Sequence, residues 1–136
     1  MKNFITIDGL DDFKKEIAKI KKQAPIELDG ILSDMAFDVE AESKRSMQGT
    51  PKTGRTYRRG SVSHTASSPG NAPAVDTGQL LQNISVKRRK KADYDVGSRK
   101  GAPHGFWLEF GTRSVAKRPW LTPAFDKIVS RFKSYL

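Results

Sequence analysis

Apolar residues recur at helical spacing near the start of the chain. Four positions at i, i+3, i+7 and i+10 are apolar: Leu10, Phe13, Ile17 and Ile20. This spacing predicts an amphipathic helix, with aspartates near its start and lysines near its end, as the helix dipole favours. Pro25 interrupts the pattern and is suited to open a second helix.

The second helix is predicted to be the longest of the protein. Its apolar stripe has positions at i, i+4, i+7 and i+11: Leu28, Leu32, Met35 and Val39. Most acidic residues of the segment lie outside this stripe. We expect the helix to end near Ser46.

Residues 47–75 lose the apolar periodicity and are rich in Gly, Ser, Thr and Pro, which predicts a mobile extended arm or long loop. Loops of this length in compact domains are functional or disordered. Residues 56–59 and 61–65 can pair as a hairpin around Gly60, although the sequence does not require it. Asp76 is then expected to cap a short helical turn that includes Leu80.

Two short strands are predicted after this turn. Apolar Ile84 and Val86 alternate with polar residues from 83 to 89, as in a strand with one buried face. Tyr94 and Val96 mark a second strand that ends at Gly97. An antiparallel pair this small needs covering elements, and we expect the helices of both halves of the chain to pack on it.

The last third of the chain predicts two aromatic-rich helices. Phe106, Trp107 and Phe110 lie at i, i+1 and i+4, so a short helix gathers them near one side, and Gly111 can end it in the αL conformation. The following helix is expected to use Thr122 as N-cap and Pro123 at N1, with apolar positions at helical spacing through Phe132. We expect the two helices, joined by residues 112–118, to clasp the core.

Together these elements predict one α+β domain over residues 1–136. Two N-terminal helices, one of them long, and a C-terminal helix pack on a small antiparallel sheet, and the long arm interrupts the domain. A chain of this length buries about two-thirds of its unfolded surface.

Composition narrows the functional classes. There is no cysteine, which excludes disulfides and thiolate chemistry. No apolar run approaches the roughly 18 residues of a membrane span, so we expect no membrane partner. Lys and Arg number eight against ten acidic residues in positions 1–46, but seventeen against five in positions 47–136. This polarity suits head-to-tail stacking of copies, or an acidic partner, as well as it suits DNA.

Three boxes resemble one family. They are residues 64–80, which follow a Ser-x-Pro-Gly-x-x-Pro-Ala-x-Asp-Thr-Gly-x-Leu pattern, Leu-Glu-Phe-Gly-Thr at 108–112, and Arg-Pro-Trp-Leu-Thr-Pro-Ala at 118–124. Their order resembles the tail-component family of tailed bacteriophages, small proteins that complete the tail at the head–tail junction. The chain departs from that pattern at residues 105–107, where Gly-Phe-Trp stands in place of an expected tyrosine–alanine pair.

The resemblance implies a structural virion protein of a phage or prophage, made in the host cytoplasm. It would act as a ring subunit in tail completion and head–tail joining, with other connector or tail proteins as partners. We expect subunit or partner contacts at Arg55, Tyr57, Arg58, Arg59, Trp107, Glu109 and Arg118. We expect a shape-setting role for Pro69, Gly70, Pro73, Asp76, Gly78, Gly111, Thr112, Pro119, Trp120 and Pro123.

Glu109 has two interpretations. It is the only acidic residue between Asp95 and Asp126. It can pair with Arg113 or Arg118 at the end of its own helix, or form an ion pair with another subunit, since buried carboxylates are usually paired.

No enzyme site is indicated. His64, Asp76 and a serine among residues 61–68 can be drawn as a triad, but no nucleophile-elbow pattern surrounds those serines. His104 with Asp93 and Glu109 matches no common metal-ligand spacing. We therefore predict a protein without catalytic activity, cofactor or metal.

The alternative function is a small basic nucleic-acid-binding module. Five successive cations run from Lys87 to Lys91 at the expected hairpin tip and could contact phosphates. Aromatic residues do not interleave with them, and no helix-turn-helix, zinc-finger or phosphate-loop pattern is present. The charge run therefore predicts at most non-specific DNA contact, and a solvated turn explains it equally well.

Overall fold

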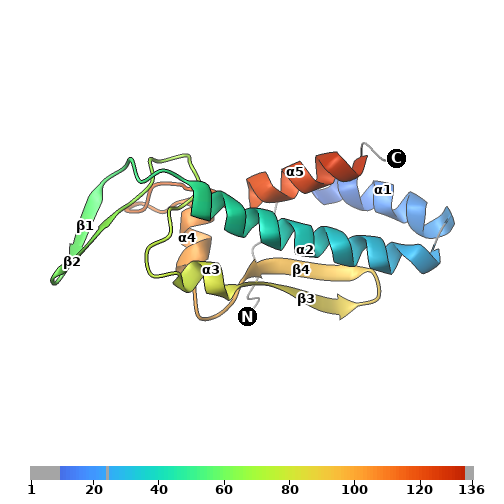
Figure 1. Ribbon diagram of the computed structural model, residues 1–136. Coiled ribbons are helices and arrows are strands. Elements are labelled where there is room, and N and C mark those ends of the chain that lie inside the picture. The colour runs from blue at the N-terminus through green and yellow to red at the C-terminus, as the bar shows by residue number, and fades with distance from the viewer. Residues whose placement is uncertain (1–9, 24, 134–136) are drawn as a thin grey trace.

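The computed structural model describes residues 10–23 and 25–133 and confirms the α+β class (Figure 1). Its elements are α1 (Leu10–Gln23), α2 (Pro25–Gly49), β1 (Thr56–Arg59), β2 (Val62–Thr65), α3 (Gln79–Asn83), β3 (Ile84–Lys90), β4 (Asp93–Ser98), α4 (His104–Phe110) and α5 (Thr122–Lys133). The strands form two separate antiparallel pairs, β1–β2 and β3–β4.

Helix α2 runs along the middle of the molecule. Helices α1 and α5 lie on one side of it and the β3–β4 hairpin on the other (Figure 1). The sheet is thus covered by α2, while α5 packs on α2. We expected helices of both halves of the chain to cover the sheet, and this is confirmed for α2. Helix α5 lies in a second layer, on the side of α2 away from the sheet. Aromatic contacts join the outer helices, with Phe13 edge-on to Phe125 at 5.8 Å and to Phe132 at 6.3 Å.

Helix α2 continues beyond the predicted end at Ser46 to Gly49. Met47 explains the extra turn, because it is 3% exposed and belongs to the core. The hydroxyl of Thr50 then donates to the Ser46 carbonyl at 2.5 Å and satisfies an acceptor at the helix end. A single methionine followed by polar residues shows no helical period, so the apolar pattern predicts an end three residues too early.

The β3–β4 hairpin matches the sequence pattern to within a residue or two at each end. Ile84 pairs with Ser98 and Val86 with Val96, and a bulge lies between Arg88 and Lys90. Asp29 of α2 anchors the turn by accepting from the Ala92 amide at 2.6 Å and the Tyr94 hydroxyl at 3.1 Å. The Ala92 hydrogen bond, helped by that of Tyr94 and by the Arg88 charge, lowers the pKa of Asp29.

One apolar cluster connects the N-terminal and C-terminal halves. Its most buried members are Ile84, Ala102, Trp120 and Leu121, each at most 1% exposed. Val39 of α2 and Ile128 of α5 complete the same cluster, so the long helix, the sheet and the last helix share one core.

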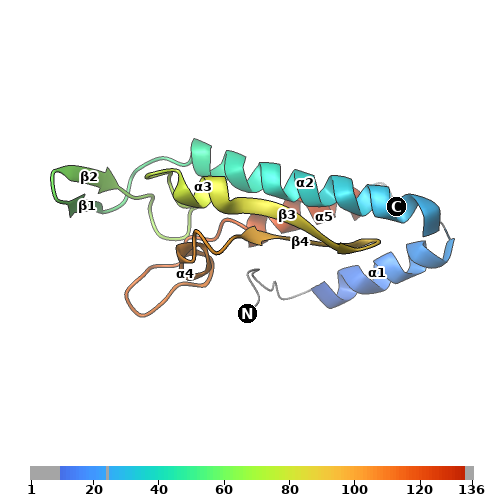
Figure 2. The same ribbon diagram turned by 90° about the horizontal axis from the view of Figure 1, so that it is seen from below.

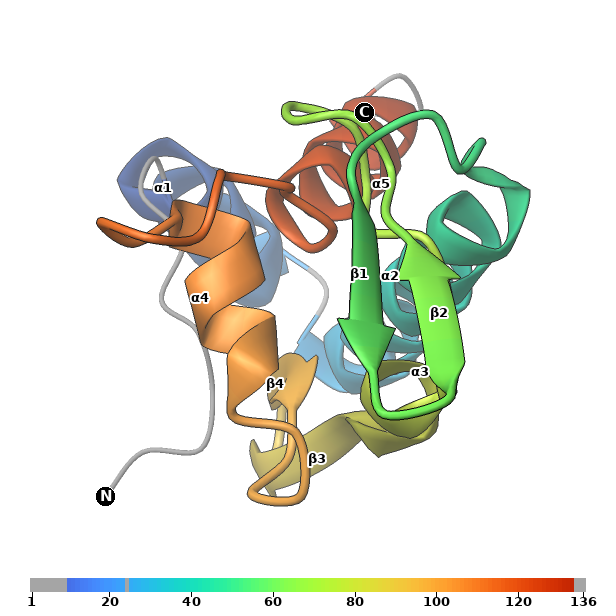
Figure 3. The ribbon, with the colours of Figure 1, turned by 90° about the vertical axis from the view of Figure 1, so that its left-hand side faces the viewer.

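The predicted arm at residues 47–75 divides into two structures. Its first part contains the β1–β2 hairpin, which projects from one end of the molecule (Figures 1 and 3). Its second part, residues 66–75, returns to the body and buries Ser67 and Pro73. The return segment contains small residues in irregular order, so no periodic pattern marked it as packed.

Candidate assembly interface

The β1–β2 hairpin is built from polar and basic residues. Thr56 pairs with Thr65 and Arg59 with Val62, around a turn in which Gly60 has φ 60°. Every residue of β1 is exposed, and the Arg55 guanidinium lies 5.4 Å from the centre of the Tyr57 ring. The hairpin that the sequence allows around Gly60 is thereby confirmed. A two-stranded ribbon without an apolar face is stabilised mainly where it joins the body.

Hydrogen bonds hold the base of this hairpin. The Gly54 amide donates to the Ala66 carbonyl at 2.8 Å, and the Ala66 amide donates to the Arg55 carbonyl at 2.9 Å. Arg118 adds a link from the far end of the chain, because its Nε donates to the Ser67 carbonyl at 3.0 Å. The hairpin therefore extends from a fixed root.

Arg118 lies inside the subunit and not at the interface expected for it. Only 7% of the residue is exposed, and its guanidinium group also donates to the Ala116 carbonyl at 3.3 Å. Its backbone amide also donates to Leu108 at 2.6 Å. These bonds fasten the loop after α4 to the root of the hairpin, so Arg118 positions the hairpin from within.

Asp76 does not cap α3, contrary to expectation. The residue before this helix is Gly78, with φ 82°, and no side chain caps it. The Asp76 carboxylate instead accepts from Arg59 of the hairpin and lies 3.6 Å from Nδ1 of His64. Asp76 thus faces the hairpin, and the start of α3 has no side-chain cap.

A cavity of about 390 Å³ lies beside this root. Its lining comes from the hairpin, the return segment, α3 and α4, and includes Tyr57, His64, Ser67, Leu80, His104 and Arg118. The Ser67 hydroxyl is fully buried and has no hydrogen-bond partner within the described part of the chain. Burial lowers the pKa of His104, and the Asp76 charge opposes that shift.

This burial predicts a pH dependence. The unfolded chain takes up a proton on His104 near pH 6.5, whereas the folded chain takes it up only at lower pH, so the free energy of unfolding should fall as pH drops through this window. His104→Gln should flatten that dependence of stability on pH, because the variant has no imidazole to protonate. Urea midpoints at about pH 7.5 and about pH 5.5 test this, and equal slopes for parent and variant would contradict it.

Glu109 does not pair with Arg113 or Arg118, and its burial within the subunit argues against an ion pair with another subunit. Its carboxylate is 1% exposed and forms no ion pair within the described residues. Oε2 accepts from the amides of Trp120 at 2.7 Å and Leu121 at 2.9 Å. Oε1 accepts from the Thr122 amide at 2.9 Å and from the Thr122 hydroxyl. Three backbone amides and one hydroxyl therefore satisfy the acceptors of this buried carboxylate.

The same bonds correct the predicted start of α5. The Leu121 carbonyl accepts the first helical bond from Phe125 at 2.8 Å, so the helix begins one residue earlier than expected. The Thr122 hydroxyl donates to Glu109 and does not cap the helix. A carboxylate from α4 thus caps α5 across the chain, at the end where negative charge suits the helix dipole. Pro123 needs no such acceptor because it lacks an amide hydrogen.

The aromatic side chains of α4 face outward, which corrects the predicted core clasp. Phe106, Trp107 and Phe110 are 53%, 48% and 41% exposed, and the two phenylalanine rings lie 5.0 Å apart. Gly105 and Glu109 form the buried side of the helix. The core tryptophan of this region is Trp120, whose indole donates to the Gly105 carbonyl at 2.8 Å.

Gly111 ends α4 as predicted, with a different geometry. Its φ of 75° is positive, but its ψ of 162° lies outside the αL region. Its amide donates to the Trp107 carbonyl at 2.7 Å. The chain then turns at Thr112, whose amide donates to Val115 at 2.8 Å, and this turn returns the loop along α4.

The basic run on β3 is partly neutralised. Arg88 lies 3.5 Å from Asp29, and Arg89 lies 3.1 Å from Asp95. Only the three lysines of the run, all exposed, have no ion pair within the described residues. Phosphate contact by this hairpin remains a prediction that rests on these lysines alone.

Catalytic and metal-binding groups are sparse in the described chain. His64 and Asp76 do come together, but no hydrogen bond to a serine is recorded for His64 within residues 10–133. Across the same residues no cluster of three or more His, Asp or Glu side chains could hold a metal. Nor is any helix in that part of the chain long and apolar enough to cross a membrane.

Comparison with known families identifies the chain. Residues 11–111 match the HK97-gp10-like family model, described as "Bacteriophage HK97-gp10, putative tail-component". This match spans well over half of the 136 residues. The chain belongs to this family. No curated protein and no solved structure matches it.

The HK97-gp10-like match confirms the family that the three boxes indicate and supports a structural role in a phage tail. It contains the box at 64–80 and most of the box at 108–112, whereas the box at 118–124 lies beyond it. Structurally, the matched segment includes the hairpin, the long helix, the sheet and α4. It also reaches Glu109 but excludes the three residues whose amides this carboxylate binds.

Proposed function

We propose that this protein is a tail-completion or head–tail connector subunit that acts in a ring without catalysing a reaction. Family membership supports a tail component, and the projecting hairpin is the observation that supports a connector within that class. The hairpin has no apolar face of its own and contributes no residue to the core cluster, which supports a use in contact with a neighbour.

The hairpin's contact residues are Arg55, Tyr57 and Arg58, which are exposed on a fixed root. Arg59 belongs to the same strand but is already paired with Asp76. Two guanidinium groups and an aromatic ring suit an acidic or mixed protein surface, and they are enriched in interface hot spots. We assign these three residues to contact with a neighbouring subunit or tail protein, and Arg59 to the support of the hairpin.

Deleting the hairpin should prevent head–tail joining without unfolding the subunit. In a phage or prophage that lacks this gene, the parent chain supplied from a plasmid should restore joined particles, as counted by electron microscopy. A variant with residues 56–65 replaced by a Gly-Ser linker should restore at most about a tenth as many, because the hairpin lies outside the core cluster. An unchanged thermal transition would show that the body still folds.

A charge-matched pair separates recognition from net charge. Arg55→Ala with Arg58→Ala removes two exposed cations from the hairpin, and Lys21→Ala with Lys22→Ala removes two from α1. Only the first pair should lower the yield of joined particles. Normal joining in the absence of the gene would overturn the proposed function, and equal effects of the two pairs would overturn the role of the hairpin.

A further inference from the structure

The outer side of α4 is an aromatic face, defined by Phe106, Trp107 and Phe110. Three large rings, each at least two-fifths exposed, form one of the concentrations of apolar surface that mark protein contacts. The loop that follows contributes exposed Arg113 and Lys117. From residue 96 to residue 125 the only acidic side chain is Glu109, which is buried. The aromatic face therefore has a basic rim.

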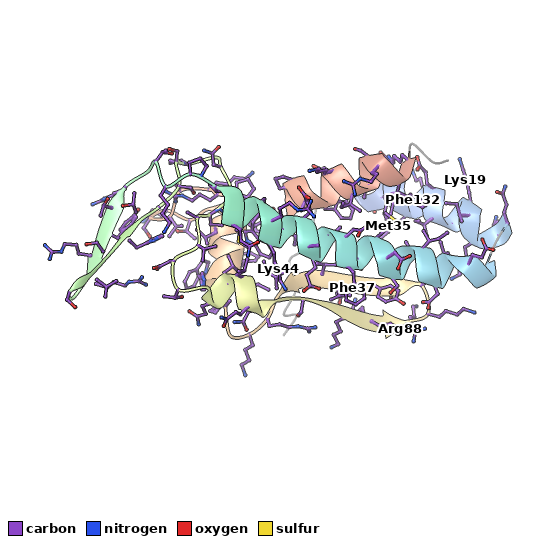
Figure 4. All side chains as sticks on the ribbon, viewed as in Figure 1. Lys19, Met35, Phe37, Lys44, Arg88 and Phe132 are labelled. Carbon is purple, nitrogen blue, oxygen red and sulfur yellow. The ribbon has the colours of Figure 1, made fainter. Side chains whose placement is uncertain are left out.

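Helix α2 has a surface of the opposite charge. Phe37 is 55% exposed, and Figure 4 shows it on the near side of α2. Asp34 and Asp38 are exposed three residues before it and one after it, and neither forms an ion pair within the described residues. We call these three residues the acidic face. It presents one apolar ring beside two carboxylates that have no ion pair within the described residues.

The two faces lie on opposite sides of the molecule. In Figure 2, α2 lies along one margin and α4 along the other, and Figure 3 shows the same separation from the end. The buried side of α4 packs inward, since Gly105 lies against Leu80 and Ser98, so its aromatic face turns away from the body. Two different surfaces on opposite sides are the arrangement that a heterologous, head-to-tail interface requires, and such an interface gives a ring when the rotation from copy to copy closes.

We propose that the aromatic face of one subunit packs on the acidic face, Asp34, Phe37 and Asp38, of the next copy. The rings of α4 meet Phe37, and Arg113 and Lys117 of the loop approach the two aspartates. Charge complementarity selects a second copy as the occupant and fixes the direction of the contact. This inference rests on the proposed function, because it supplies the lateral contact of the ring.

Because the chain has no cysteine, the contact can be tested by disulfide trapping. Phe37→Cys and Trp107→Cys change two exposed positions and should leave the thermal transition near that of the parent. A mixture of the two single variants should give disulfide-linked dimers on oxidation. A chain carrying both substitutions should give a ladder of higher multimers, in joined particles and in concentrated purified protein.

A matched control pairs Trp107→Cys with Ser130→Cys, an exposed position on α5, which should cross-link at least tenfold more slowly. Homodimers of Trp107→Cys alone would overturn the head-to-tail geometry. A disulfide within the double-variant monomer would overturn the placement of the two faces. A photoreactive maleimide on Cys at position 107 that labels a different tail protein would overturn the choice of partner.

The outcome also separates this contact from the proposed function. Joined particles that form normally with the double variant, but without a disulfide between positions 37 and 107, would overturn the contact and leave the connector role intact. Asp38→Lys alone and Arg113→Glu alone should each reduce trapping about tenfold, and the two changes placed in one chain should partly restore it. A failure of the parent chain to support joining would count against the connector role. Disulfide trapping between positions 37 and 107 in purified protein would still test the contact.

Discussion

Replacing Glu109 with alanine should destabilise the protein more than almost any other single substitution. The carboxylate accepts four hydrogen bonds from Trp120, Leu121 and Thr122, all in buried or partly buried surroundings. Each buried donor left without an acceptor costs about 1–3 kcal/mol. The expected loss is on the order of 3–6 kcal/mol, a large share of a typical stability of about 5–15 kcal/mol.

Glu109→Gln tests the charge and the acceptor pattern at nearly constant size. The amide keeps one oxygen, but its NH₂ group faces backbone donors where the second oxygen was. We expect a loss on the order of 2–4 kcal/mol and a fall in the melting temperature of on the order of 10 °C. Asp34→Asn is the matched control, since this exposed acidic residue lies outside the core and should change stability by less than about 0.5 kcal/mol.

Urea denaturation followed by tryptophan fluorescence measures these losses, because Trp120 lies at the bonded site. A Glu109→Ala midpoint within experimental error of the parent would show that the carboxylate does not cap α5. A normal midpoint for Glu109→Ala together with a loss of particle joining would instead restore the intersubunit ion pair that the sequence suggested.

Local elements could be predicted because their information is local. The β3–β4 hairpin was predicted to within a residue or two, since Ile84 and Val86 alternate with polar neighbours and a basic turn separates the strands. Helix α5 was recognised from the Thr-Pro pair and the periodic apolar residues, among which Ile128 is 3% exposed. The end of α2 was missed because the burial of Met47 depends on residues far along the chain.

The roles of the α4 side chains could not be predicted from their spacing. Phe106, Trp107 and Phe110 define one side of a helix, but spacing alone does not say whether that side faces the core or solvent. The absence of a side chain at Gly105 decides which side faces the core, because a Cβ there would lie 2.8 Å from Leu80 and from the Ser98 hydroxyl. Only a glycine face can approach the core this closely, so the aromatic rings remain outside.

Among the candidate site residues, the sequence identified the hairpin cations but not the residues that support them. Arg55, Tyr57 and Arg58 are exposed as an interface requires, whereas Glu109 and Arg118 have structural roles inside the subunit. Most hydrogen bonds of these two charged side chains join them to backbone atoms at least eleven residues away in the sequence. Every residue has a backbone amide and carbonyl, so a backbone partner cannot be recognised from the pattern of side chains. A search for residues of opposite charge therefore paired Glu109 with arginines that it does not contact.

Gly54 is a supporting residue with no sequence signal beyond being a glycine in a polar segment. Its φ is not positive, so turn geometry does not require it. Close packing does, because a Cβ at this position would lie 2.2 Å from the Ser67 carbonyl oxygen and 2.7 Å from its carbon. The obstacle is backbone and cannot rotate aside. Any side chain must therefore separate the two strands at the root of the hairpin.

Gly54→Ala should consequently release the root of the hairpin while the core remains folded. The separation removes the hydrogen bonds that join Ala66 to Gly54 and to Arg55, and it strains the contact of Arg118 with Ser67. We expect local opening of the root to become easier by on the order of 2–4 kcal/mol, measured as much faster amide exchange at Ala66, with little change in β3–β4 or in the thermal transition. Particle joining should fall as far as it does after hairpin deletion, since an unanchored hairpin cannot present its cations in a fixed direction.

Gly49→Ala is the matched control, because no atom lies within 4 Å of a Cβ built at that position. It lies at the end of α2 and should be neutral or stabilising by up to about 1 kcal/mol. If Gly54→Ala matched this control in stability, exchange and joining, the close approach of residues 54 and 67 would not exist in solution. If it lost joining but kept the protected Ala66 amide, position 54 would contact the neighbour directly, and the fixed root would not explain the function of the hairpin.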